Sequence, residues 1–140
     1  MMIGGHCINT CSSTQKNVTL SSGEAELVAA VKMSAEVIGM IQMAEDWGVQ
    51  LEGRILTDSS AALAVVRRKG NGKLRHIRVG TMWIQEKEEN GELMFSKVKG
   101  EKNPADLMTK GLGVKVIDAQ MERICQEYRK GRAEIGLKLT

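Results

Sequence analysis

The sequence predicts an α/β fold in which one mixed β-sheet has helices on its faces. Segments with helical spacing of apolar residues alternate with short runs of branched and aromatic residues. The predicted order is strands, helix, strand, helix, helix, strand, helix, helix, which is typical of a layered α/β domain. A long helix between residues 20 and 54 would also suit a crossover connection that packs back on the sheet.

Length and composition favour one soluble domain. A chain of 140 residues can bury a substantial core, and its 42% hydrophobic and 26% charged residues are ordinary for a globular protein. No apolar run approaches the ~20 residues that span a bilayer, so we expect no membrane partner. The three cysteines, Cys7, Cys11 and Cys125, lack metal-ligand spacing and indicate reduced thiols. We expect an intracellular protein, cytoplasmic or nuclear, with an organellar location left open by the acid-free, Ser- and Thr-rich N-terminus.

The first half of the chain predicts a hairpin followed by a long helix. Short apolar runs separated by Gly4-Gly5 predict a ragged hairpin over residues 3 to 20. The helix should run from about Ser22 to Trp47, since Ser21 and Glu24 have capping-box spacing and a glycine follows at position 48. Its apolar face comprises Leu27, Ala30, Val31, Ser34, Val37, Ile38, Ile41 and Ala44.

The second half predicts two more strands and four more helices. Strands are expected at 54–57 and 92–98, and helices at about 58–69 and 74–88. A further short helix should start at Asn103-Pro104, where Asn is a good cap and Pro suits the first helical position. A C-terminal helix within residues 113–140 would present an apolar stripe, for which core packing is the first interpretation and a partner surface the second: Ile117, Met121, Ile124, Cys125 and Tyr128.

Positive charge is concentrated in one segment. The net charge is +3, yet residues 67 to 78 alone contain six cations and no acid: Arg67, Arg68, Lys69, Lys73, Arg75 and Arg78. A basic loop on a mildly acidic body is the expected footprint of a phosphate-binding surface. A solvated surface loop would have the same composition, and charge by itself does not choose between the two.

Three acids lie where a strand or loop meets a helix: Glu26, Asp58 and Asp106. In open α/β sheets, ligands bind at such junctions, at the carboxyl ends of the strands. Converging carboxylates could hold two Mg²⁺ ions and support phosphodiester hydrolysis. The alternative is that helix dipoles alone stabilise these acids, with Asp58 as an N-cap and Asp106 in a first helical turn. Glu26 is harder to explain this way, because it borders an apolar helix face.

Four motifs, the first of them in two segments, then resemble one family. Ser13-Thr14-Gln15-Lys16 and Val18 to Leu27 resemble the "SKKQ" and "ALSS-x-EAE" segments of copia-type retrotransposon polyproteins. Thr57 to Ala62 resembles the family's "DNQSA", Lys73 to Ile77 its "RTKHI", and Asn103 to Lys110 its "ADILTK". The matching order and spacing cover about residues 3 to 112. The resemblance therefore implies a partial ribonuclease-H-like domain at 1–112, followed by the helix and tail at 113–140.

The resemblance implies a fold, an activity and roles for particular residues. The fold is that of ribonuclease H, and the activity is Mg²⁺-dependent (or Mn²⁺-dependent) hydrolysis of RNA in an RNA/DNA hybrid. Glu26, Asp58 and Asp106 would be the catalytic and metal-binding acids. The hybrid would be recognised through its backbone and 2′-hydroxyls. Arg67, Arg68, Lys69, Lys73, Arg75 and Arg78 would face phosphates, and His76 would touch the nucleic acid or hydrogen-bond in the interior.

The match also departs from the family pattern. The family has a catalytic acid on the first, central strand, but the resemblance begins after that strand and no Asp or Glu precedes Glu24. Arg78 stands where the family usually has Asp. Loss of a central strand would leave backbone groups unpaired, so we expect another protein chain to complete the sheet. A truncated gene product is a further alternative.

Two functions follow. The first is a retroelement-derived ribonuclease-H-like domain that is inactive as it stands, so that whether the chain is an enzyme remains open. The second is a domesticated, non-catalytic subunit that binds nucleic acid, RNA/DNA hybrid or RNA, or has a structural role in a larger assembly.

Overall fold

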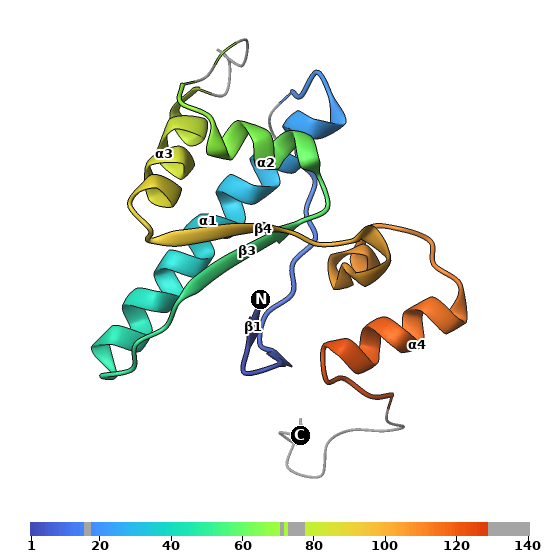
Figure 1. Ribbon diagram of the computed structural model, residues 1–140. Helices are drawn as coiled ribbons and strands as arrows, with labels where there is room; N and C mark the ends of the chain where they lie inside the picture. The colour runs from blue at the N-terminus through green and yellow to red at the C-terminus, as the bar shows by residue number, and fades with distance from the viewer. Residues whose placement is uncertain (16–17, 71, 73–77, 129–140) are drawn as a thin grey trace, which may run out of the picture. The chain divides into compact units, whose positions relative to one another are not determined.

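A computed structural model describes residues 1–15, 18–70, 72 and 78–128 of the chain (Figure 1). The chain divides into two compact units. We call Ser13–Asn103 the core unit, and Met1–Ser12 together with the residues from Pro104 onward the terminal unit. The predicted boundary at residue 112 came from the extent of the family resemblance, whereas the two units are defined by packing. The division into units therefore does not test that boundary, which stays a prediction.

The longest element of the core unit is helix α1, Ser22–Asp46. At its start, the Ser21 hydroxyl accepts a hydrogen bond from the Glu24 amide at 3.2 Å, and the Glu24 carboxylate accepts one from the Leu20 amide at 2.7 Å. At its end, Gly48 adopts a φ of 76° and donates to Glu45 at 2.8 Å. This left-handed termination suits glycine. The predicted start, cap and stop of the helix are therefore confirmed.

One face of α1 packs into the core, as predicted. Leu27, Ala30, Ser34 and Ala44 are buried. By length and composition, α1 is also apolar enough to cross a membrane, with a mean hydropathy of 1.5, although no uninterrupted apolar run was evident in the sequence. A core helix has the same composition. In α1, 22% of this apolar window is buried.

Strands β3 (Gly53–Thr57) and β4 (Leu93–Lys97) form a parallel pair in which Gly53 lies opposite Leu93 and Thr57 opposite Lys97. Between them in sequence come α2 (Ser60–Arg67) and α3 (Arg78–Glu89). Both predicted strands are confirmed. The predicted start of the third helix at residue 74 lies outside the described residues.

Only one face of this parallel pair is covered. Gly53, Ile55 and Thr57 are buried, whereas Arg54 is exposed and Leu56 keeps 54% of its surface exposed. In the described part of the chain, β3–β4 and the hairpin β1–β2 are separate two-stranded sheets. The expectation of one mixed sheet with helices on its faces is therefore wrong for these residues. The strands alternate in burial, and only one set of their side chains faces the helices.

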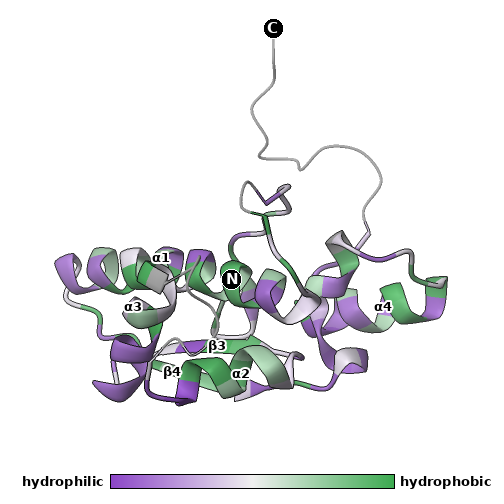
Figure 2. Ribbon diagram, turned by 90° about the horizontal axis from the view of Figure 1, so that it is seen from above, coloured by the Kyte–Doolittle hydropathy of each residue, from purple (hydrophilic) through white to green (hydrophobic). Residues whose placement is uncertain are grey.

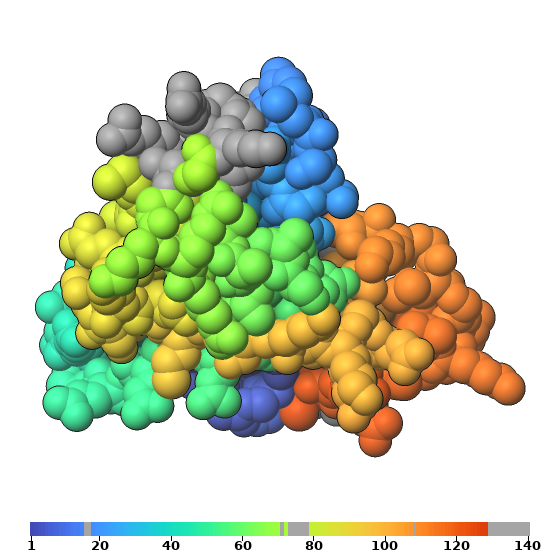
Figure 3. Space-filling view, turned by 45° about the horizontal axis from the view of Figure 1, so that its top comes forward, coloured from blue at the N-terminus to red at the C-terminus, as the bar shows by residue number. Residues whose placement is uncertain are grey.

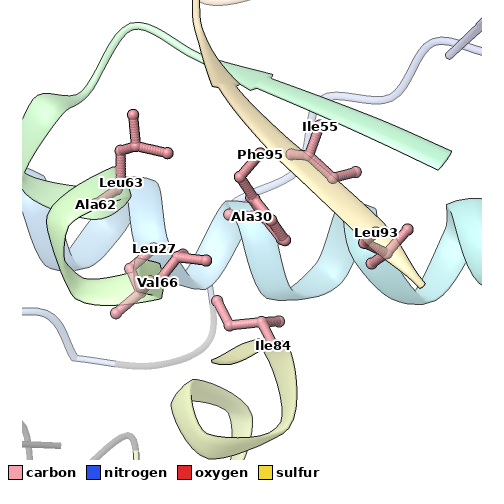
Figure 4. Packing of buried hydrophobic residues seen from close by; sticks show 9 residues of the cluster. All are labelled: Leu27, Ala30, Ile55, Ala62, Leu63, Val66, Ile84, Leu93 and Phe95. Atoms are coloured by element: carbon pink, nitrogen blue, oxygen red, sulfur yellow. The ribbon is translucent and has the colours of Figure 1, made fainter. Parts of the chain in front are cut away.

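The core lies where α1, α2 and α3 meet the buried face of the two strands. Figure 4 shows its side chains gathered between these elements, and Figure 2 shows hydrophobic and hydrophilic residues alternating along α1. Helices α2 and α3 lie side by side in Figure 3. The buried cluster consists of Leu27, Ala30, Ile55, Ala62, Leu63, Val66, Ile84, Leu93 and Phe95.

Glycine permits the close approach of α1 and β3. A Cβ atom at Gly53 would lie 2.5 Å from Leu93 Cδ2 and 3.0 Å from both Val37 Cγ1 and Ile41 Cδ1. Real Cβ atoms do not approach other atoms as closely as 2.5 Å, so a side chain at this position would displace its neighbours. The role of Gly53 is not visible in the sequence, because only the packing of the helix on the strand shows that the space is filled.

The terminal unit begins with a short hairpin of β1 (Met2–Ile3) and β2 (His6–Cys7). Gly4 and Gly5 have φ values of 56° and 85°, as a two-residue hairpin turn requires. The hairpin predicted over residues 3 to 20 is thus confirmed only at its start. Beyond Cys7, no residue up to Thr19 is in a strand in the described part, since the Ser- and Thr-rich sequence lacks apolar alternation.

Short helices follow the core strands. η2 (Gly100–Lys102) ends the core unit, and η3 (Pro104–Met108) and α4 (Val114–Arg123) belong to the terminal unit. The helix predicted at Asn103-Pro104 is present, in 3₁₀ form. The predicted apolar stripe of the last helix is wrong beyond Ile124, because Cys125 takes a φ of 52° and ends the helix. Tyr128 is 71% exposed.

Candidate active site at the carboxyl end of the parallel strands

Asp58 follows directly on β3, where the sequence analysis placed it, and its side chain is half-buried. It does not cap α2. The hydroxyl of Ser59 has that role and accepts a hydrogen bond from the Ala62 amide at 3.1 Å. Thr57 Oγ1 in turn accepts from the Ser59 amide at 3.1 Å. The N-cap alternative for Asp58 is therefore wrong, and its position beside the strand end needs another explanation.

Residues from β4 and its following loop surround this strand end. The Val98 amide donates to the Thr57 carbonyl at 2.9 Å, which continues the parallel pairing past the strands. Lys97 Nζ donates to Ser60 Oγ at the start of α2. A Cβ atom at Gly100 would lie 3.7 Å from Asp58 Oδ2, so the Gly100 backbone faces this carboxylate.

Lys97 and Gly100 were not predicted as site residues from the sequence. The sequence does contain a signal for Lys97, since it lies at the end of the second predicted strand. Two parallel strands end at the same edge of a sheet, so Lys97 lies at the same edge as Asp58. The structure places an ammonium group, a hydroxyl and a carboxylate at this edge: Lys97, Ser60 and Asp58. The ammonium group and the positive end of α2 favour an anion, whereas the carboxylate favours a cation.

Glu26 lies in α1 just beyond the first turn, whose acid is Glu24. Its side chain is exposed. Gly23, three residues earlier, would place a Cβ atom 3.1 Å from Ala61 Cβ, so the start of α1 packs against the start of α2. Glu26 and Asp58 therefore both belong to the core unit, each near the beginning of one of two helices in contact.

Asp106 lies in η3 of the terminal unit. Its Oδ2 atom is 2.9 Å from Lys110 Nζ, and only 14% of its side chain is exposed. Lys110 lies two residues beyond η3, so this ion pair joins η3 to the segment that follows it. This contact gives Asp106 a structural role within its own unit.

The donor set of a two-metal site is not present in the described part of the chain. No group of three or more His, Cys, Asp and Glu side chains there is arranged to hold a metal ion. Two Mg²⁺ ions in phosphodiester hydrolysis require several converging carboxylates. The described residues thus do not fit the pair of ions, and the metal-binding roles of Glu26, Asp58 and Asp106 stay predictions.

The basic segment is only partly described. Lys73, Arg75 and His76 lie outside the described residues, as does the side chain of Arg78. Arg67 donates to the Phe95 carbonyl at 2.8 Å, and its Nε lies 3.4 Å from Glu88 Oε1. Arg67 therefore ties α2 to β4 and α3, which the charge pattern of the sequence does not reveal.

Lys69 is also paired with an acid of α3. Its Nζ lies 2.9 Å from Glu89 Oε1, and this hydrogen bond and charge raise the pKa of Lys69 above its ordinary value. The Lys69 side chain remains 89% exposed, so water screens the pair. Acids brought in by α3 thus reduce the positive charge of the segment below what the sequence indicates.

The chain is similar to part of one curated protein, the retrovirus-related Pol polyprotein from transposon TNT 1-94 of Nicotiana tabacum, with 30% identity over 125 residues. The aligned region covers 88% of this chain but only 9% of that polyprotein. No protein-family profile and no solved structure matches the chain. The similarity supports an origin of this chain in a retrotransposon polyprotein.

Proposed function

We propose that this chain is a ribonuclease-H-like domain of retrotransposon origin that binds nucleic acid and does not cleave it unaided. The observation that carries this proposal is the position of Asp58, half-buried at the carboxyl end of a parallel strand pair beside Lys97 and the start of α2. Ligand sites of α/β sheets occur at this edge. The similarity to a Pol polyprotein supports the same origin.

The lack of unaided cleavage follows from the donor set. Glu26 and Asp58 are the candidate acids of the core unit, and a pair of divalent cations needs more carboxylate ligands than two. The Glu26 side chain is exposed to solvent. Nucleic-acid binding can persist without these metal ligands, because the phosphates are contacted by cationic side chains.

Lys97 and the exposed part of the basic segment would supply these cations. Lys97 is held by Ser60 at the strand end, and Arg68 is exposed after α2. Backbone recognition of this kind is independent of sequence and weakens as salt rises, since bound counterions are released. A hybrid and a structured RNA would both bind, and competition between them distinguishes the preferred ligand.

The first experiment incubates the folded chain with a labelled RNA/DNA hybrid and Mg²⁺ or Mn²⁺. We expect binding without cleavage by the chain. The matched variant is Asp58→Asn, which keeps the shape of the side chain and removes its charge. Cleavage by the chain that disappears in Asp58→Asn would contradict the proposal and establish an enzyme.

A second experiment locates the binding surface. We compare the Lys73→Ala/Arg75→Ala double variant with Arg67→Ala in hybrid-binding titrations at several salt concentrations. The double variant should lower the salt slope by about 1 for each phosphate that it no longer binds. Arg67→Ala should change the slope less, because Arg67 is engaged with Glu88 and the Phe95 carbonyl. Equal slopes for the chain and the double variant would remove the basic segment from the interface.

A partner strand would add to β3. Arg67 occupies the Phe95 carbonyl of β4, whereas no second strand pairs with β3 in the described residues. Parallel sheets are usually covered on both faces, yet Leu56 is 54% and Met94 37% exposed. An open edge beside apolar side chains is a template for strand addition. Another protein chain that completes this sheet would also make the domain a structural subunit.

Sedimentation velocity of the purified chain tests this proposal. We expect self-association at micromolar concentration through the open edge of β3. Leu56→Lys should reduce association more than Met94→Lys, because Met94 lies on β4, where Arg67 already occupies a backbone carbonyl. A stable, monodisperse monomer of 15.3 kDa would overturn the proposal.

A further inference from the structure

Two of the three cysteines lie close together in the terminal unit. The Cys7 amide of β2 donates to the Ile124 carbonyl at 3.4 Å, and Cys125 is the next residue. Standard bond lengths along this path place the two Cα atoms at most about 9 Å apart. Disulfide-bonded cysteines usually have Cα atoms about 4.4–6.8 Å apart, a range within that bound. The backbones of the two cysteines are therefore close, and a disulfide between them requires their side chains to turn toward one another.

The backbone at Cys125 has an unusual conformation. It is the non-glycine residue with a positive φ, 52°, in the described part of the chain. Its amide donates to Glu122 at 3.0 Å, and the amide of Gln126 donates to Met121 at 2.9 Å, which completes a helix end that usually contains glycine. Cysteine at this position keeps a side chain where glycine would fit with less strain.

Neither thiol is in a disulfide, and the Cys7 thiol donates a hydrogen bond to the Asn9 carbonyl at 3.7 Å. Cys125 is exposed and Cys7 is half-buried. Cys11 is also free and exposed, and it lies four residues after Cys7 in sequence. It thus serves as an internal comparison for reactivity that depends on exposure alone.

We propose that Cys7 and Cys125 form a reversible disulfide when the protein meets a hydroperoxide. One thiolate attacks the O–O bond, is oxidised to a sulfenic acid and releases one molecule of water from hydrogen peroxide. The second thiol then attacks the sulfenic sulfur, forms the S–S bond and releases the second water. The two thiols lose two electrons and two protons in total, and a thiol reductant reverses the change.

The disulfide would join the two segments of the terminal unit, which precede and follow the core unit in sequence. It closes a loop of about 120 residues, and loops of this length restrict the unfolded chain strongly. The oxidised terminal unit should therefore melt higher than the reduced one, by about 5 °C or more. The hairpin and the end of α4 would then stay joined even when the terminal unit unfolds, until the bond is reduced.

The test uses Cys11→Ser, which leaves Cys7 and Cys125 as the two cysteines. The variant is treated with hydrogen peroxide, alkylated and digested with trypsin, and we expect residues 1–16 linked to residues 124–129 by a bond that dithiothreitol cleaves. The matched control is Cys7→Ser, which keeps exposed Cys11 with Cys125. We expect at least a tenfold lower linked yield in this control, because proximity, and not exposure, selects Cys7.

A second measurement uses the chain without substitutions, so it does not depend on whether a variant folds. After peroxide treatment and alkylation, fragment spectra of residues 1–16 should show the alkyl label on Cys11 and not on Cys7. Equal cross-linking in Cys7→Ser and Cys11→Ser would overturn the proposal. A Cys7–Cys11 bond, or dimers between chains, as the main product would overturn it as well.

Discussion

The core unit and the terminal unit differ in how much apolar surface they bury. In the core unit, nine hydrophobic side chains from three helices and two strands form one buried cluster. In the terminal unit, Ile124 is the buried hydrophobic residue among those described, while Met2, Val114 and Tyr128 are exposed. Burial of apolar surface is the main source of stability. The core unit therefore has its own source of stability, and the terminal unit depends on helix ends, turns and a few hydrogen bonds.

The largest expected effect comes from emptying the core. Phe95→Ala removes a side chain that is 3% exposed and should lower the free energy of unfolding by about 3–5 kcal/mol. Chemical denaturation followed by circular dichroism measures the change. The control is Met94→Ala on the open face of the same strand, where the loss should be far smaller. Equal losses would mean that the two faces of the strand are covered alike, which would break the comparison.

A smaller loss in the free energy of unfolding is expected at the contact between α1 and β3. Gly53→Ala introduces a Cβ atom 2.5 Å from Leu93 Cδ2, and overpacking of this kind costs about 1–3 kcal/mol. Gly39→Ala is the matched control in α1, because a Cβ atom there meets no neighbour within 4 Å. It should stabilise the protein by about 0.5–1 kcal/mol, since alanine favours the helix. A neutral Gly53→Ala would show that Leu93 moves aside freely.

The two units end their helices with the same hydrogen bonds but different residues, Gly48 after α1 and Cys125 after α4. Under reducing conditions, Cys125→Gly should stabilise the terminal unit by about 1 kcal/mol because it removes left-handed strain. Gly48→Ala should destabilise the core unit by a similar amount. Hydrogen exchange at the two helix ends measures both changes. A loss of protection in Cys125→Gly would show that the cysteine side chain has packing contacts of its own.

The smallest expected effect is electrostatic. Lys87 and Asn90 donate hydrogen bonds to the Glu92 carboxylate, at 2.6 Å from Lys87 Nζ, and they lower the pKa of Glu92 below its ordinary value. A lowered folded pKa contributes stability above the ordinary pKa, and this contribution disappears as pH falls through the folded value. Lys87→Gln should move the pKa of Glu92 upward in NMR titration. An unchanged pKa would assign the shift to Asn90.

Local sequence signals predicted much of the core unit. The apolar spacing and capping residues of α1, the two strand runs and the strand-end position of Asp58 depend on neighbours within a few residues, and such patterns are visible in the sequence. The site around Asp58 was only partly predictable. Lys97 and Gly100 reach it from about 40 residues away, so their role depends on the parallel pairing of β3 with β4.

The sequence by itself thus determined α1, the two parallel strands and the start of the hairpin, because propensity, periodicity and caps are local. The tertiary structure decided which of them meet. It alone shows that one face of the parallel pair is covered, that acids of α3 pair with Arg67 and Lys69, and that Cys7 lies beside the end of α4. These features depend on contacts between residues far apart in sequence, where a small difference in packing decides which side chains touch.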